Sequence, residues 1–356
     1  MRIVHLTFTF RQGGIPALLV DITNEQVKAD PTNIVVINNQ IHEEMLVEVN
    51  PDVKVYKINR SEGNKNPYYA LKLNYILWRL KPDIIHCHGE KCIEYLLPLF
   101  RKKAVLTVHD TLKLNPLYYS KYKKLYAISK TVQQDVLSHF ELKSEIVYNG
   151  IQTNKIIIKT KIKKAQQDVF KMIQIGRLVT DIKGQHLSIE VIKILVYKYK
   201  ITNIHLDFIG WGKDYDQLIK IIQEFNLENN ISFLGLKDRP YIYSNLCEYD
   251  LMVHPSLYEG FGLNIVEAMA AKVPVLVSDT EGPMEVIENG KFGYFFKTGN
   301  VNDFTEKLIQ ILNKSNTEFQ DELIENAYYH VVNNFDIKDT AQGYVKEYKM
   351  LTEKAD

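Results

Sequence analysis

The sequence has few cysteines and no long apolar run. Three cysteines, Cys87, Cys92 and Cys247, occur in 356 residues. Any disulfide scheme would leave one unpaired, and none has the two-residue spacing of zinc or redox motifs. We therefore expect buried, reduced thiols. No apolar run approaches the roughly 20 residues that a membrane-spanning helix needs. Because the sequence also lacks low-complexity tracts, its 46% hydrophobic and 24% charged residues indicate a globular protein.

The first residues show none of the features of a targeting segment. Residues 1–6 enter a strand-like run directly, without a charged leader, an apolar signal stretch or a cleavage site. We therefore expect a cytoplasmic protein. At roughly 150 residues per domain, the length predicts about two domains.

Basic and acidic residues are unevenly distributed along the chain. Residues 1–164 hold 25 Lys and Arg against 15 Asp and Glu, which leaves 19 of the 44 cations and 28 of the 43 acids for the remainder. Cations cluster at 101–103, 121–124 and 161–164, and the second cluster is flanked by Tyr118, Tyr119, Tyr122 and Tyr126. This pattern fits a solvated surface, or a face that contacts an anionic membrane or a lipid-diphosphate acceptor. The absence of a recognition motif argues against nucleic acid as a partner.

Strand-like and amphipathic segments alternate along the chain, which predicts an α/β fold with parallel sheets covered on both faces. We expect two doubly wound, Rossmann-like domains, at residues 1–160 and 165–335, joined by a polar, lysine-rich linker. The expected strands are at residues 2–8, 33–37, 53–57, 83–86, 104–108, 125–128 and 145–148, and then at 170–175, 205–209, 231–234, 251–253 and 273–277. Three helices follow residue 300, and the last, at about 337–356, could return to the first domain.

In the first domain, a glycine pair and three histidines lie at predicted strand ends. Gly13-Gly14 precedes a helix and suits phosphate binding, although a dehydrogenase would need Gly-x-Gly-x-x-Gly and an acidic residue after the second strand. His86, His88 and Cys92 suggest zinc, but strand alternation lets only the two histidines converge, so we expect no metal. His109 ends the fifth strand and is expected at the mouth of an interdomain cleft.

The second domain opens with a pattern typical of an anion site. Gly176-Arg177 follows the first strand, and Lys183-Gly184 comes just before a helix. Two cations beside glycines at a helix N-terminus suit a diphosphate. Gly210 follows the next strand and leaves room for a ligand or a tight turn.

The segment from His254 to Ala268 gives the strongest signal. It follows a strand, contains a glycine-rich turn with Glu259, and enters a helix that carries Glu267. Carboxylates can accept hydrogen bonds from sugar hydroxyls. A glycosidase would place two carboxylates on either side of one bond. The neighbouring cations favour a phosphate-bearing donor, and therefore group transfer.

These motifs strongly resemble glycosyltransferase family 4. The most specific parts are Gly176-Arg-Leu with Lys183-Gly184, and Glu259-Gly-Phe-Gly-Leu with Glu267. The resemblance covers nearly the whole chain and implies a GT-B fold and a retaining enzyme. It also implies a nucleoside-diphosphate sugar as donor, without a bound metal or other cofactor.

The resemblance also implies a role for individual residues. Arg177 and Lys183 would bind the donor diphosphate, and Glu267 the ribose. Glu259 would hold the donor sugar, His109 would reach across from the first domain, and backbone near Leu236 would contact the base. The implied catalytic residues are Arg177, Lys183, His109 and Glu259, and the implied donor-binding residues are Gly14, Gly176, Gly210, Leu236, Gly260, Phe261, Gly262, Leu263 and Glu267.

The expected reaction moves a hexose or N-acetylhexosamine from a nucleoside-diphosphate sugar, with UDP as the expected nucleotide, to a saccharide hydroxyl in cell-surface polysaccharide, O-antigen or capsule synthesis. Peripheral contact with the inner face of the plasma membrane is part of this expectation. A nucleotide-sugar epimerase of the same fold and a non-catalytic, glycosyltransferase-like partner subunit remain as alternatives. Gln152 stands where many relatives carry an aspartate, and Ile15-Pro16 where many carry a glutamate. These departures concern domain hinging and acceptor contacts.

Overall fold

The computed structural model describes residues 1–11, 13–109, 116–160, 168–314 and 318–353. The chain divides into two compact units. Unit 1 comprises residues 1–152 and 335–356, and unit 2 comprises residues 153–334. Of the stretch expected as a linker, the described part lies along unit 2. Ile157 and Lys159 donate backbone hydrogen bonds to the carbonyls of Tyr243 and Ala271.

Unit 1 is built on a seven-stranded parallel sheet in the order β3-β2-β1-β4-β5-β6-β7. The strands are β1 (Ile3–Thr7), β2 (Thr32–Asn38), β3 (Lys54–Arg60), β4 (Ile84–Cys87), β5 (Ala104–Val108), β6 (Lys124–Ala127) and β7 (Ser144–Ile146). The helices are α1 (Gly14–Gln26), α2 (Glu43–Val47), α3 (Tyr68–Leu80), η1 (Glu90–Tyr95), α4 (Pro98–Arg101), α5 (Pro116–Tyr119), α6 (Lys130–Phe140) and α15 (Ile337–Glu353). The strand order reverses between β1 and β4, so the loops after these strands diverge at one edge of the sheet.

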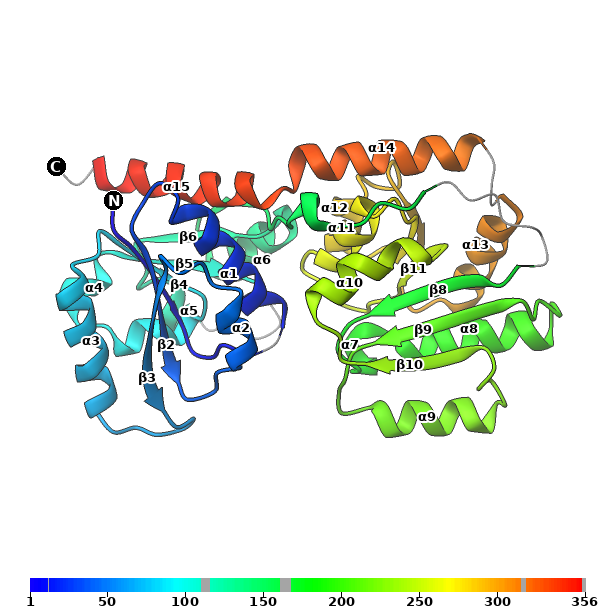
Figure 1. Cartoon of the computed structure of the whole chain (residues 1–356), viewed down its shortest axis with the longest axis horizontal. Helices are drawn as coiled ribbons and strands as arrows, with labels where there is room; N and C mark the ends of the chain where they lie inside the picture. The colour runs from blue at the N-terminus through cyan, green and yellow to red at the C-terminus, as the bar shows by residue number, and fades with distance from the viewer. Residues whose placement is uncertain (12, 110–115, 161–167, 315–317, 354–356) are drawn as a thin grey trace. The chain divides into compact units, whose positions relative to one another are not determined.

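The last helix, α15, is part of the core of unit 1 (Figure 1). It packs on α1, and its Tyr344 and Tyr348 are completely buried. The Tyr344 hydroxyl lies 2.9 Å from Thr107 Oγ1 on β5, so the tyrosine satisfies its polar atom inside an apolar cluster. Unit 1 therefore needs both ends of the chain.

Unit 2 has a six-stranded parallel sheet in the order β10-β9-β8-β11-β12-β13. The strands are β8 (Phe170–Ile175), β9 (Ile204–Ile209), β10 (Ile231–Gly235), β11 (Leu251–His254), β12 (Val275–Ser278) and β13 (Tyr294–Phe296). The helices are η2 (Thr153–Lys155), α7 (Thr180–Lys183), α8 (Gln185–Tyr197), α9 (Tyr215–Glu224), α10 (Arg239–Asn245), η3 (Leu246–Glu248), α11 (Leu263–Ala270), α12 (Glu281–Val286), α13 (Val301–Lys314) and α14 (Glu318–Asn334). The order reverses between β8 and β11, which places a second switch point there.

The structure confirms the predicted fold class of two parallel α/β sheets. It adds the three-residue β13, which the sequence analysis did not predict. It also changes the interpretation of the tyrosines that flank the cation cluster at 121–124. Tyr119, Tyr122 and Tyr126 are buried, so they belong to the core rather than to an interfacial face. The 161–164 cluster lies outside the described residues. Cys87 and Cys92 are buried free thiols as expected, while the free Cys247 is half-buried.

Candidate functional site

The candidate site of unit 2 lies at its switch point, where the loops after β8 and β11 meet. Lys183, at the end of α7, places Nζ 2.5 Å from Glu259 Oε2 in the loop after β11. Backbone contacts fix this approach: the Leu257 N–H donates to the Ile182 carbonyl at 2.8 Å. The predicted cation and the predicted sugar-binding carboxylate are thus direct partners.

Gly184 holds the two loops together by its lack of a side chain. Its φ is +64°, and a Cβ at this position would lie 2.1 Å from the carbonyl oxygen of Pro255. The loop after β11 therefore packs directly on the backbone of the α7–α8 junction. Only glycine meets both conditions, which explains the Lys183-Gly184 pair in physical terms.

Glu259 is held as a carboxylate. Burial alone would raise its pKa, but the hydrogen bond from His254 and the charge of Lys183 outweigh burial and bring the pKa to about 2. The His254 Nε2 lies 3.1 Å from Glu259 Oε2 and 3.0 Å from Ser256 Oγ. Burial lowers the pKa of His254 itself, so this ring is neutral near pH 7. The site thus combines one anion, one cation and a neutral donor.

Arg177 follows β8 and is exposed. Its guanidinium has no hydrogen-bond or ion-pair partner among the described residues, whereas its backbone carbonyl accepts a hydrogen bond from Gln185 at 2.8 Å. The backbone is fixed while the charge stays available. A bidentate donor of this kind suits a phosphate.

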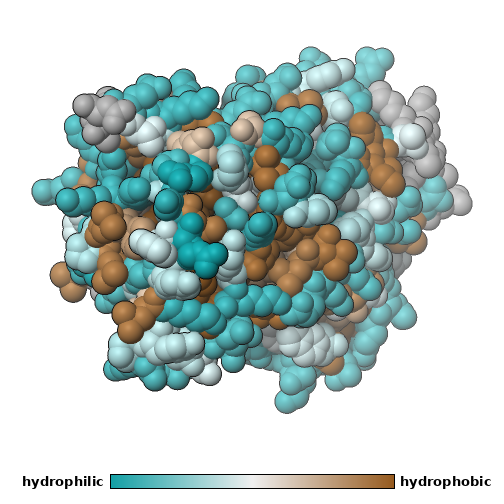
Figure 2. Space-filling model, turned by 60° about the vertical axis from the view of Figure 1, so that its left-hand side comes forward, coloured by the Kyte–Doolittle hydropathy of each residue, from teal (hydrophilic) through white to brown (hydrophobic). Residues whose placement is uncertain are grey.

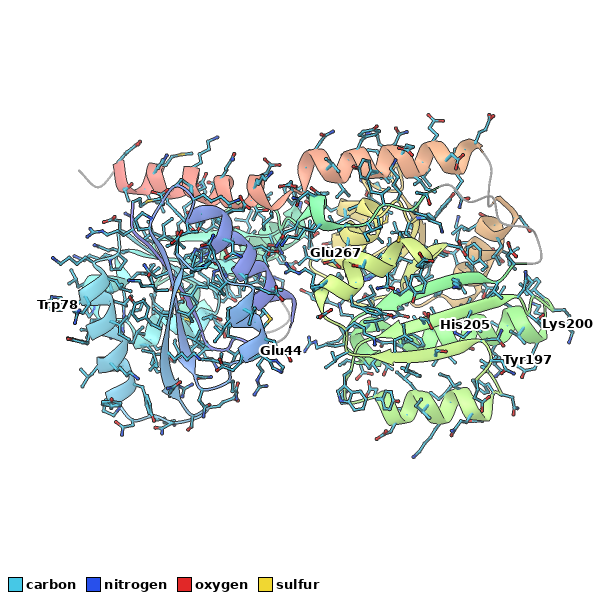
Figure 3. The ribbon with its side chains drawn as sticks, viewed as in Figure 1. Glu44, Trp78, Tyr197, Lys200, His205 and Glu267 are labelled. Carbon is cyan, nitrogen blue, oxygen red and sulfur yellow. The ribbon has the colours of Figure 1, made fainter. Side chains whose placement is uncertain are left out.

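The glycine-rich turn leads into α11. Gly260 and Phe261 are buried, and the Phe261 ring anchors the turn in the core. Gly262 caps the helix, and the amides of Gly262 and Leu263 have no acceptor among the described residues, as is usual for a first helical turn. Glu267 lies one turn further along α11 and is half-buried (Figure 3).

The loops after β8, β9 and β10 are joined in a row. The Gly176 N–H donates to the Ile209 carbonyl, and the Gly210 N–H donates to the Gly235 carbonyl. Leu236 comes directly after β10 and is exposed. Gly176, Gly210 and Leu236 therefore follow three neighbouring strands at the carboxyl edge that also carries Arg177.

Sequence reasoning missed several residues that support this arrangement. His254 contacts Glu259, and Asn264 on α11 donates to the Ile175 carbonyl at 2.5 Å, which ties the helix to β8. Gln174 donates to the Lys183 carbonyl at 2.8 Å. His254 had a signal, because it ends a strand inside the strongest motif. A buried glutamine in a strand offers no such signal.

Gly14 and His109 lie in unit 1, also at a strand-end edge. Gly14 begins α1, which follows β1, and His109 comes directly after β5. Burial lowers the pKa of His109 to about 4, so the ring is neutral near pH 7. Its Nε2 lies 3.3 Å from His88 Nδ1.

His109 ends a buried chain of hydrogen bonds. His88 Nε2 lies 3.0 Å from His5 Nδ1, and His5 Nε2 lies 2.7 Å from Gln26 Oε1 on α1. Because a neutral imidazole donates from one nitrogen and accepts at the other, each ring fixes the tautomer of the next. With Gln26 Oε1 as acceptor, His5 and His88 donate from Nε2 and His109 keeps Nδ1 as its acceptor.

His5, His86 and His88 also form a cluster whose ligand atoms lie within 4.8 Å of one another. The two histidines of the strand converge as predicted, joined by His5 from β1 rather than by Cys92. Both nitrogens of His86 already have partners, Thr107 Oγ1 at 2.6 Å and the Tyr348 hydroxyl at 2.5 Å. The cluster is therefore satisfied as a hydrogen-bond network.

Comparisons with known proteins agree with this architecture. Residues 12–155 match the model of Glycosyltransferase Family 4, and residues 156–330 match that of Glycosyl transferases group 1. The crystal structure of Anabaena HepE in complex with UDP and glucose is similar, with a TM-score of 0.79 and 20% identity over 98% of this chain and 99% of that one. The structural likeness identifies the fold as GT-B.

Two curated relatives are similar in sequence. The poly(ribitol-phosphate) alpha-N-acetylglucosaminyltransferase of Staphylococcus aureus (strain COL) is 28% identical over 216 residues, which span 60% of this chain and 40% of that protein. The N-acetylgalactosamine-N,N'-diacetylbacillosaminyl-diphospho-undecaprenol 4-alpha-N-acetylgalactosaminyltransferase of Campylobacter jejuni is 24% identical over 327 residues, 83% of this chain and 84% of that one. The two family models together account for most of the sequence, and the chain belongs to glycosyltransferase family 4, the retaining, nucleotide-sugar-dependent glycosyltransferases.

Proposed function

We propose that the enzyme transfers a hexose or N-acetylhexosamine from a UDP-sugar, with retention, to a hydroxyl of a saccharide acceptor in surface-glycan synthesis. The observation that carries this proposal is the Lys183–Glu259 pair, together with an Arg177 guanidinium that has no partner among the described residues. The cations suit the diphosphate and the carboxylate suits the sugar hydroxyls. HepE in complex with UDP and glucose supports uracil as the base, and the two curated relatives support an N-acetylhexosamine.

Each predicted residue has a part in this proposal. Arg177 and Lys183 stabilise the charge that develops on the leaving diphosphate, and Glu259 holds the donor sugar. The amides of Gly262 and Leu263 add donors at the first turn of α11. Glu267 binds the ribose and backbone near Leu236 contacts the base. Gly176, Gly210, Gly260 and Phe261 shape the loops that bring these groups together, and Gly14 and His109 contribute from unit 1.

The chemistry proposed for these residues requires no protein nucleophile. The bond between the anomeric carbon and the diphosphate oxygen breaks as the acceptor hydroxyl attacks from the same face. The departing phosphate accepts the hydroxyl proton. Because charge develops on the leaving group, donors aimed at the diphosphate contribute most to the rate, about 3–4 kcal/mol for each important donor.

The proposal extends to the chemical class of the acceptor. We propose a lipid-linked saccharide, because the Campylobacter relative is named for a diphospho-undecaprenol substrate and because unit 1 carries a small excess of basic residues, 24 Lys and Arg against 20 Asp and Glu. The enzyme would then work peripherally at a membrane that displays its acceptor.

A thermal-shift panel tests the donor. UDP, GDP and ADP, and then the sugars of the nucleotide that binds, are added at about one hundred times their Kd, which should stabilise the protein by about 2.7 kcal/mol. UDP and one UDP-sugar are expected to raise Tm. If none of the nucleotides raises Tm, the proposal is contradicted. Release of free UDP that needs no acceptor would instead indicate an epimerase or a hydrolase.

A further inference from the structure

Helix α3 of unit 1 presents an apolar stripe to solvent. Four large side chains are more than half exposed, namely Tyr68 at 58%, Leu71 at 64%, Tyr75 at 58% and Trp78 at 61%. Their spacing of three, four and three residues puts them on one side of the helix, while Leu73 and Leu77 on the other side are fully buried. Figure 3 shows Trp78 projecting from α3 away from the sheet.

The stripe continues onto the neighbouring segment. The side-chain oxygen of Asn74 on α3 accepts a hydrogen bond from the Leu97 amide at 2.9 Å, which fixes Leu97 beside the helix. Leu97 and Leu99 are 51% and 65% exposed. Figure 2 brings this side of unit 1 forward, and apolar side chains there interrupt the hydrophilic surface. A patch of this kind marks an interaction surface.

The charges around the stripe are mainly positive. The charged residues of α3 are Lys72 and Arg79, and α4 is followed by Lys102 and Lys103. Glu94, in η1, is the exposed acidic residue of the η1–α4 segment. An apolar and aromatic face bordered by cations fits an anionic surface.

A basic hollow of about 780 Å³ adjoins α4. Its lining residues are Asp83, Ile84, Arg101, Lys102, Lys103, Lys121, Tyr122, Lys123 and Thr352. The one carboxylate, Asp83, already binds Arg2 at 3.0 Å. Lys103 and Lys123 donate to the uncharged carbonyls of Pro82 and Leu351, and the charge of Lys103 also contributes to the lowered pKa of Asp83. The hollow therefore favours an anion such as a phosphate.

We propose that the stripe and the hollow together form a membrane-docking surface for an anionic bilayer. Tyr68, Leu71, Tyr75 and Trp78 enter the interfacial region, Leu97 and Leu99 extend the contact, and the hollow receives lipid phosphates. Tyrosine and tryptophan suit this depth because each has an apolar body and a polar atom. Among the described residues, no helix has both the length and the hydropathy to cross a bilayer.

A bilayer explains the combination better than a protein partner does. Cations attract anionic lipid over the whole surface, at about fivefold in affinity for each Lys or Arg near the membrane. The apolar stripe supplies the part of the affinity that salt does not screen. This inference rests on the proposed function only in placing the acceptor at a membrane, and the contact itself needs neither donor nor acceptor.

Vesicle sedimentation tests the surface directly. Protein is mixed with phosphatidylcholine vesicles that contain about 30% phosphatidylglycerol, and with pure phosphatidylcholine vesicles. We expect binding to the anionic vesicles at low salt and weaker binding at about 0.5 M salt, where the charges are screened. Leu71→Ser with Trp78→Ser should weaken binding at least about tenfold at both salt concentrations, because apolar burial is lost. Lys102→Glu with Lys121→Glu should abolish the preference for phosphatidylglycerol.

The chain provides a matched control on unit 2. Tyr199 is 43% exposed and lies beside lysines in sequence, so Tyr199→Ser with Lys200→Glu changes an aromatic and a cation that are not part of the proposed surface. This variant should sediment like the wild type. The UDP-induced thermal shift of every variant reports the donor site separately, so loss of docking and failure of the proposed donor are distinguishable.

Three results would overturn the docking surface, of which the first two come from sedimentation. The first is a wild type that does not sediment with anionic vesicles at low salt, and the second is a Leu71→Ser, Trp78→Ser variant that sediments as well as the wild type. The third is a dimer, measured by light scattering, that this double variant dissociates. A dimer would assign the stripe to a second copy of the chain.

Discussion

Lys183 Nζ lies 2.5 Å from Glu259 Oε2, and the pair spans the loops after β8 and β11, where the strand order of unit 2 reverses. The carboxylate neutralises the ammonium and fixes its position before any donor arrives. A donor phosphate that reaches Lys183 therefore finds the cation already placed. Preorganisation of this kind lowers the reorganisation that the reaction requires.

Removal of either cation should slow transfer more than it weakens folding. Arg177→Ala and Lys183→Ala should each lower kcat about a hundredfold or more, because the leaving diphosphate loses a positive donor. Steady-state kinetics with the UDP-sugar found in the thermal-shift panel measure this effect. Lys291→Ala is the matched control, since Lys291 is exposed and its contacts, an ion pair with Glu288 and the ring of Phe292, are with its neighbours in sequence. Near-normal turnover in the Arg177 or Lys183 variant would contradict the role of that residue at the leaving diphosphate.

Glu259 should make the stability of unit 2 sensitive to acid. Its pKa falls from 4.5 to about 2 on folding, so between these values the unfolded chain binds the proton and the folded unit does not. The stabilisation is complete above pH 4.5 and is lost as the pH falls toward 2, up to about 3 kcal/mol.

The measurement for Glu259 compares two proteins across pH. Urea unfolding of the wild type and of Glu259→Gln, followed at pH 6 and at about pH 3, gives the free-energy difference at each pH. The wild type should be the more stable at pH 6, and the difference should shrink in acid. An unchanged difference at the two pH values would mean that the carboxylate is not held by Lys183 and His254.

The histidine chain of unit 1 should stay uncharged well below neutral pH. Burial lowers the pKa of both His5 and His109 from 6.5 to about 4. Because the unfolded chain takes up protons first, unit 1 should lose stability as the pH falls from 6.5 to 4. NMR titration of labelled histidines measures the midpoints, and the nitrogen shifts report the tautomers. A midpoint near 6.5 for His109 would contradict this prediction.

Gly184→Ala should damage both the fold and the activity of unit 2. The new Cβ would meet the Pro255 carbonyl at 2.1 Å in a left-handed backbone, so the Lys183 loop must shift. We expect a loss of more than about 1 kcal/mol in unfolding free energy together with a lower kcat. Gly299→Ala is the control, because Gly299 has a similar φ of +72° and its Cβ would meet nothing closer than 3.9 Å. Equal effects of the two substitutions on kcat would exclude the contact with Pro255 as the cause.

The alternation of strands and helices could be predicted from the sequence because parallel strands are continuously apolar and helices are amphipathic. Strands β5 and β8 coincide with the expected ranges, and the others differ by a few residues at their ends. The three-residue β13 escaped prediction because its pairing with β12 is a tertiary contact without a local pattern. The tyrosines near Lys121 were associated with an interfacial face because they lie close to the lysines in sequence. Neighbours in sequence need not share a face in the folded unit.

The candidate site was predictable in its residue types and not in its contacts. Arg177, Lys183 and Glu259 stood out because they follow strands beside glycines. Their pairing could not be predicted, because strand order decides that the loops after β8 and β11 are neighbours. The stripe on α3 has a helical period, but only the fold reveals that no described residue of unit 1 covers it.

The placement of α15 in unit 1 has a consequence for how the protein is made. Unit 2 is one continuous segment, whereas unit 1 lacks Tyr344 and Tyr348 until α15 has left the ribosome. The part synthesised first is therefore the part that finishes folding last. During synthesis, the core of unit 1 stays incomplete while unit 2 folds. The apolar residues of the nascent first half are exposed during this time, and chaperones bind surfaces of this kind.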